Sequence, residues 1–129
     1  MLYTPHFLTG AAIVKLVPNP VIGLPLALLS HFVLDMMPHN DFGIKPGASL
    51  KSIFSKENKQ RNFFIAVMSI DIILLILSFL WLLFTSDYYW LVIGGGVAIS
   101  PDALEQSLLI FGKQIPGLQY KLSYFDNRR

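Results

Sequence analysis

The sequence predicts an all-α, polytopic membrane protein whose residues 1–129 form one transmembrane helical domain. Composition is the first reason, because 53% of the residues are apolar and 14% are charged, whereas soluble domains average about 45–50% apolar and about 25% charged. The mean hydropathy of +0.55 is correspondingly high. The second reason is that four apolar runs are suited to lie in a bilayer, at about residues 4–17, 20–37, 61–85 and 88–112.

The first two runs begin with residues that favour a helix start. Thr4 and Pro5 offer a threonine N-cap followed by proline at the first helical position. The run at 4–17 is short, since a helix needs about 20 residues to cross the hydrocarbon core. We therefore expect it to cross fully only with help from its neighbours or from local thinning of the bilayer. Asn19 can cap the second run, and Pro20 can start it.

The third run is the clearest candidate for a membrane span, because its apolar stretch 63–84 contains a single charged residue, Asp71. A tight turn at 86–87 then leads into Tyr-Tyr-Trp, an aromatic cluster typical of the membrane interface. The fourth run, 88–112, is interrupted by a proline and by acidic residues. Its consecutive glycines, 94–96, are expected to let it approach another helix closely.

The basic residues indicate how these helices are oriented. Apart from Lys15, every Lys and Arg lies in or beside a polar loop at 40–60, or in a tail at 113–129. The positive-inside rule places both segments and both termini in the cytoplasm, which predicts a multi-pass protein of the cell membrane with membrane lipid as its partner. The net charge of +2 is too small and too scattered to favour nucleic acid. The absence of cysteine excludes disulfides and thiolate metal sites.

Several acidic residues and histidines lie inside the apolar runs or at their ends. An Asp at the centre of a spanning helix costs about 2.5–3.5 kcal/mol on insertion scales, so such residues are usually functional or paired. The embedded runs offer Lys15 alone as a compensating cation, and a bound divalent metal would supply the missing positive charge. We expect one or two ions of zinc or manganese, with iron also compatible with these ligand types. The expected ligands are His6, His31, Asp35, Asp71 and Asp102.

Spacing and depth both support the convergence of these side chains. His31 and Asp35 are four residues apart and share a helix face, and Asp102 and Glu105, three apart, share another. Counting about 1.5 Å per residue from the cytoplasmic helix ends puts the expected ligands in the inner half of the membrane. Each also has a structural alternative, because an intramembrane His can be a hydrogen-bonded packing residue and Asp102, after a proline, can cap a broken half-helix.

Residues 30–38, SHFVLDMMP, resemble the SHxxxDxxP segment of small bacterial inner-membrane proteins that are predicted to be metal-dependent hydrolases. Residues 4–10, which begin Thr-Pro-His, are similar to the N-terminal histidine region of that family, and residues 96–102 to its glycine-rich run ending in Pro-Asp. Residues 38–41, PHND, look like the PHxD of a short subfamily. The resemblance implies a polytopic membrane protein whose metal centre consists of His6, His31, Asp35 and Asp102. Longer members also carry His-Arg-Gly-x-Thr-His and Pro-Asp-x-Asp-His, which this chain lacks.

Together with this resemblance, the residues favour a metal-dependent hydrolase that acts on a lipid or lipid-linked ester at the cytoplasmic side of the membrane. Glu105 or Asp41 would act as general base, and His39 would protonate the leaving group. Two alternatives stay open at this point. Intramembrane acids and histidines also form ion or proton pathways, for which a chain this short would work as a homo-oligomer. A non-catalytic membrane subunit would use the same polar cluster to hold its helices together.

Overall fold

The computed structural model describes residues 2–36, 54–85 and 89–110, and these residues form four α-helices and no strand. The helices are α1 (Tyr3–Leu16), α2 (Pro20–Asp35), α4 (Arg61–Thr85) and α5 (Tyr89–Ile110). The all-α prediction is confirmed for this part of the chain, and the predicted helix ends agree closely with those observed. Residues 40–53 of the predicted basic loop, and the predicted tail, lie outside the described residues.

The start of α2 follows from its own sequence. Asn19 is the N-cap, its Oδ1 accepts a hydrogen bond from the backbone N–H of Val21 at 3.0 Å, and Pro20 occupies the first helical position. Such a cap satisfies an N–H that has no partner within the helix. The predicted start of this helix is therefore confirmed.

The start of α1 differs from the expectation. The helix begins at Tyr3, with Leu2 in the N-cap position and no side-chain cap from that residue. The prediction that Thr4 is the cap was wrong, because the Thr4 hydroxyl instead donates to the backbone carbonyl of Asp71 on α4 at 2.9 Å. The first turn of α1 is thus held by a different helix.

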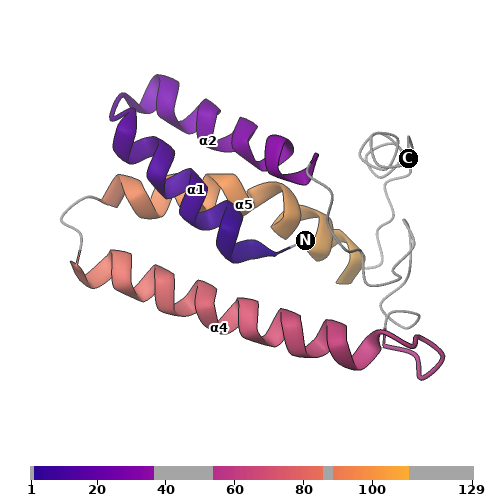
Figure 1. Cartoon of the computed structure of the whole chain (residues 1–129). Coiled ribbons are helices and arrows are strands. Elements are labelled where there is room, and N and C mark those ends of the chain that lie inside the picture. The colour runs from indigo at the N-terminus through magenta and orange to yellow at the C-terminus, as the bar shows by residue number, and fades with distance from the viewer. Residues whose placement is uncertain (1, 37–53, 86–88, 111–129) are drawn as a thin grey trace.

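α1 is the central helix of the bundle. It packs most extensively against α5 and also contacts α2 and α4. In Figure 1, α1 lies between α2 and α4 and crosses in front of α5. α1 and α2 form one antiparallel hairpin, and α4 and α5 run antiparallel to each other. As a result, the starts of α1 and α4 and the ends of α2 and α5 point to the same side of the molecule (Figure 1).

One helix of the described part of the chain, α4, is long and apolar enough to cross a membrane. α2 and the Tyr89–Leu104 portion of α5 are apolar but shorter. A helix rises about 1.5 Å per residue and the hydrocarbon core is about 30 Å thick, so the 25 residues of α4 suffice to cross it. The predicted arrangement of four embedded helices remains a prediction.

α1 and α5 approach each other so closely that their contact requires glycine. A Cβ atom on Gly10 would collide with the carbonyl oxygen of Gly94 and lie 2.5 Å from the Cβ of Ala98. A Cβ on Gly95 would lie 2.5 Å from Cδ2 of the Phe7 ring. Side chains larger than hydrogen would force the two helices apart. The predicted role of the glycine run in close helix approach is therefore confirmed for two of its members.

We expect Gly10→Ala to lower the free energy of unfolding by about 1–3 kcal/mol, the usual cost of overpacking, because the added methyl group must push α1 away from α5. Gly96→Ala is the matched control, since nothing lies within 4 Å of the position that its Cβ would take. Alanine is favoured over glycine in a helix by about 1 kcal/mol, so this variant should be neutral or slightly stabilised. Denaturant unfolding in detergent, followed by far-UV circular dichroism, measures both. Equal effects would contradict a tight contact at Gly10.

Candidate metal centre

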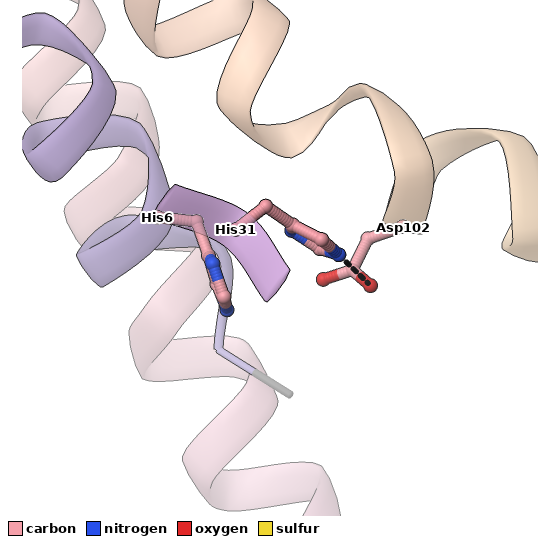
Figure 2. A group of neighbouring side chains, drawn as sticks. All are labelled: His6, His31 and Asp102. Atoms are coloured by element: carbon pink, nitrogen blue, oxygen red, sulfur yellow. Dashed lines mark ion pairs between the residues drawn. The ribbon is translucent and has the colours of Figure 1, made fainter. Parts of the chain in front are cut away.

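Four ionisable side chains from three helices meet on the side where α1 starts and α2 ends. His6 lies near the start of α1, His31 and Asp35 lie near the end of α2, and Asp102 lies in the second half of α5. The antiparallel hairpin of α1 and α2 brings the first three together, and α5 passes beside them. Figure 2 shows His6, His31 and Asp102 approaching one another from α1, α2 and α5.

The two imidazoles direct their Nε2 atoms at carboxylate oxygens. His31 Nε2 lies 3.0 Å from Oδ2 of Asp35, as their i,i+4 spacing predicts, and 3.7 Å from Oδ1 of Asp102. The second of these contacts is the dashed line in Figure 2. His6 Nε2 lies 3.3 Å from Oδ1 of Asp35. The His6 and His31 ring centroids are 4.6 Å apart, so both rings face one small volume.

Burial makes this group energetically demanding. The side chains of His6, His31 and Asp102 are 6%, 3% and 4% exposed, whereas that of Asp35 is 20% exposed. Three buried atoms in the group have no hydrogen-bond partner: Nδ1 of His6, Nδ1 of His31 and Oδ2 of Asp102. An unpaired buried polar atom costs roughly 1–3 kcal/mol. The fold therefore bears a cost for enclosing this group, and the unpaired Oδ2 of Asp102 is its one carboxylate oxygen without a partner.

Three of the four side chains lie close enough together to hold one metal ion. His6, His31 and Asp102 each offer one ligand atom, and these atoms all lie within 4.8 Å of one another. Two ligand atoms bonded to one ion at about 2.0–2.2 Å lie about 3–3.6 Å apart, and Nε2 of His31 lies 3.7 Å from Oδ1 of Asp102. The buried group could thus hold a metal ion, and its nitrogen and oxygen donors suit zinc, manganese or iron.

Asp71, the fifth predicted ligand, is not one of these grouped residues. Its Oδ2 accepts a hydrogen bond from the backbone N–H of Tyr3 at 2.6 Å, and its Oδ1 accepts one from Thr4 at 3.1 Å. Both oxygens therefore engage the start of α1, where the helix dipole favours a negative charge. The sequence analysis missed this role; a lone Asp in an apolar helix, together with a helix start that lacks an acidic cap, was the available clue.

The remaining predicted residues are not placed by the structure. His39 and Asp41 lie outside the described residues. Glu105 belongs to α5, but its side chain is outside the described part of the chain. Their predicted roles as acid and bases stay predictions from the sequence.

No family model, curated protein or solved structure matches the chain. The likeness to membrane hydrolases consequently rests on its short motifs, and among these the SHxxxDxxP segment supplies two of the four grouped side chains, His31 and Asp35. Membership of that family stays a prediction.

We expect the purified protein to retain a divalent transition metal, and His31→Ala or Asp102→Asn to lower the bound metal at least about tenfold. Loss of even an outer partner of a ligand costs about 10–100-fold in affinity, and these two residues contribute ligand atoms directly. Glu57→Gln removes an exposed carboxylate before α4 and serves as the control. Elemental analysis after dialysis against a metal buffer measures the content. Absence of metal from wild-type protein that keeps full stability in chelator would contradict the assignment.

Proposed function

We propose that the protein is an integral membrane, metal-dependent hydrolase that acts on a lipid or lipid-linked ester at the cytoplasmic side of the inner membrane. The observation that carries the proposal is a buried group of His6, His31 and Asp102, with the partly buried Asp35 beside it, inside a helical bundle with an apolar exterior. Ionisable residues at such positions are expensive and usually mark functional sites. The resemblance of the SHxxxDxxP segment supports the hydrolase class.

The surface of α4 supports the membrane part of the proposal. Although this helix has 25 residues, Asp71 and Leu82 are its buried ones. Its exposed side chains are large and apolar along the whole length, and include Phe63, Ile65, Ile70, Ile72, Ile73, Leu74, Ile76, Leu77, Phe79, Leu80, Trp81, Leu83 and Phe84. A core helix of a soluble protein would be covered, and an exposed apolar surface this large is typical of a membrane interaction. We infer that lipid covers it.

The charges around α4 support the orientation. Lys56 and Lys59 are exposed just before this helix, and Arg61 is its first residue, whereas α4 ends without a basic residue in its last turn. By the positive-inside rule, the start of α4 faces the cytoplasm. The start of α1, which carries His6, and the end of α2, which carries His31 and Asp35, point to that same side of the bundle (Figure 1). A multi-pass arrangement with both termini in the cytoplasm follows if the shorter helices are embedded with it.

Single-cysteine variants test this orientation, because the natural chain has no cysteine. Gln60→Cys and Thr85→Cys place thiols at exposed positions near opposite ends of α4. In spheroplasts, a membrane-impermeant maleimide is expected to label Thr85→Cys at once and Gln60→Cys only after permeabilisation. The reverse pattern would invert the topology, and equal labelling of both without permeabilisation would contradict a spanning α4.

The chemistry follows from how the four side chains differ in burial. His6, His31 and Asp102 would hold the ion, and a divalent metal supplies Lewis-acid polarisation and activates water near neutral pH. Asp35 contacts both Nε2 atoms and is the most exposed member of the group, so it is the member that water would reach first. Its carboxylate would complete the ligand set or accept the proton of the attacking water.

Residues predicted from the sequence complete the proposal. Glu105 or Asp41 is the further candidate for a general base, and His39 is the candidate that protonates the leaving group. Each follows a grouped residue closely in the chain, since Glu105 comes one helical turn after Asp102 and the other two follow Asp35.

Hydrolysis by protein reconstituted in lipid nanodiscs tests the function. The probes are bis(p-nitrophenyl) phosphate and p-nitrophenyl butyrate, with added Zn²⁺ or Mn²⁺. We expect turnover of one ester class that is abolished by chelator and by His31→Ala, and retained by the Glu57→Gln control. Asp35→Asn should lower kcat about 10²–10⁴-fold with metal still bound if Asp35 is a base, and should lose metal if it is a ligand. Bound metal without hydrolysis of either probe would contradict the hydrolase assignment.

A further inference from the structure

Asp71 supplies the N-terminal cap that the sequence of α1 does not provide. The first three helical residues are Tyr3, Thr4 and Pro5. Backbone N–H groups at this end of a helix have no partner within it, and proline has no N–H. The two N–H groups that exist, those of Tyr3 and Thr4, both donate to the Asp71 carboxylate.

A third hydrogen bond, between Thr4 and Asp71, joins the same two helices. The Thr4 hydroxyl donates to the backbone carbonyl oxygen of Asp71 at 2.9 Å, so side chain and backbone of each residue engage the other. Asp71 is 4% exposed and Thr4 is 9% exposed. This clamp of three hydrogen bonds joins the middle of α4 to the first turn of α1.

His6 lies two residues after Thr4, in the same turn of α1. Its Nε2 must lie within about 3–4 Å of the α2 and α5 ligand atoms to share an ion with them, and its ring is fixed in space only as well as the first turn of α1. Helix ends fray when their terminal N–H groups are unpaired. Beyond His6, contacts of Phe7 with Gly95 and of Gly10 with Gly94 set the approach of α1 to α5, whereas the clamp holds the helix end that precedes His6.

We propose that Asp71 is a positioning residue that acts through Thr4 and the first turn of α1 to hold His6 in register with the ligands of α2 and α5. The inference rests on the proposed metal site. In this role Asp71 influences where the His6 ligand atom lies, and Asp71 itself does not contact the ion. Thr4 is the second half of the same device.

The test uses Co²⁺ binding to full-length protein in detergent, because its visible spectrum reports ligand geometry as well as affinity. Asp71→Asn leaves one acceptor oxygen for two N–H groups and is expected to weaken Co²⁺ binding about 10–100-fold, as loss of an outer partner does, with an altered spectrum. Thr4→Val removes only the hydroxyl and should shift the spectrum in the same direction. Thr4→Ser keeps the hydroxyl and should show the wild-type spectrum.

Leu82→Ala is the control for lost stability, because it removes a buried side chain of α4 that lies away from the clamp. It should lower the unfolding midpoint while the Co²⁺ spectrum stays unchanged. Wild-type Co²⁺ affinity and spectrum in both Asp71→Asn and Thr4→Val would overturn the inference while leaving the metal site intact. Complete loss of Co²⁺ in Asp71→Asn with no change in Thr4→Val would also overturn it, since Asp71 would then be a ligand. Failure of the wild-type protein itself to bind Co²⁺ would instead contradict the proposed function.

Discussion

Each polar group enclosed by these apolar helices must find its partner inside the protein, because neither lipid nor a packed apolar core can offer a hydrogen bond. The bundle meets this constraint in two places. At one, imidazoles and carboxylates of α1, α2 and α5 face one another. At the other, the carboxylate of Asp71 on α4 accepts hydrogen bonds from the backbone N–H groups of Tyr3 and Thr4 on α1. Both places lie near the start of α1, so the polar interactions of four helices depend on one helix end.

The position of α1 is determined by two unlike contacts. Hydrogen bonds hold its first turn to α4, and glycine-mediated packing holds its middle against α5. His6 lies between these contacts on the same helix. Packing alone sets the distance between two helix axes, whereas the directional bonds at Tyr3 and Thr4 also limit sliding and rotation. A ligand that must meet others within a few tenths of an ångström needs both kinds of restraint.

Much of this arrangement could be predicted from the sequence, because it depends on position along a helix. Apolar runs and the Asn19–Pro20 start located the helices, and the four-residue spacing put His31 and Asp35 on one face. Counting residues also puts His6 and Asp102 in the same half of the membrane. Depth does not determine the direction in which a side chain points around the helix axis. For that reason the sequence groups Asp71 with the expected ligands, whereas its carboxylate contacts the start of α1. An aspartate that binds amides and one that binds an ion look alike in sequence.

The contacts of Asp71 with Tyr3 and Thr4 span 68 and 67 residues of chain. The two sides of each contact are therefore synthesised at different times. The first hairpin carries His6, His31 and Asp35, but Asp71 and Asp102 are synthesised only with the second. Until α4 and α5 follow, the amides of Tyr3 and Thr4 lack the carboxylate of Asp71, and the imidazoles have Asp35 but not Asp102. The group consequently forms by association of the two hairpins, and a chain truncated before α4 would lack both Asp71 and Asp102.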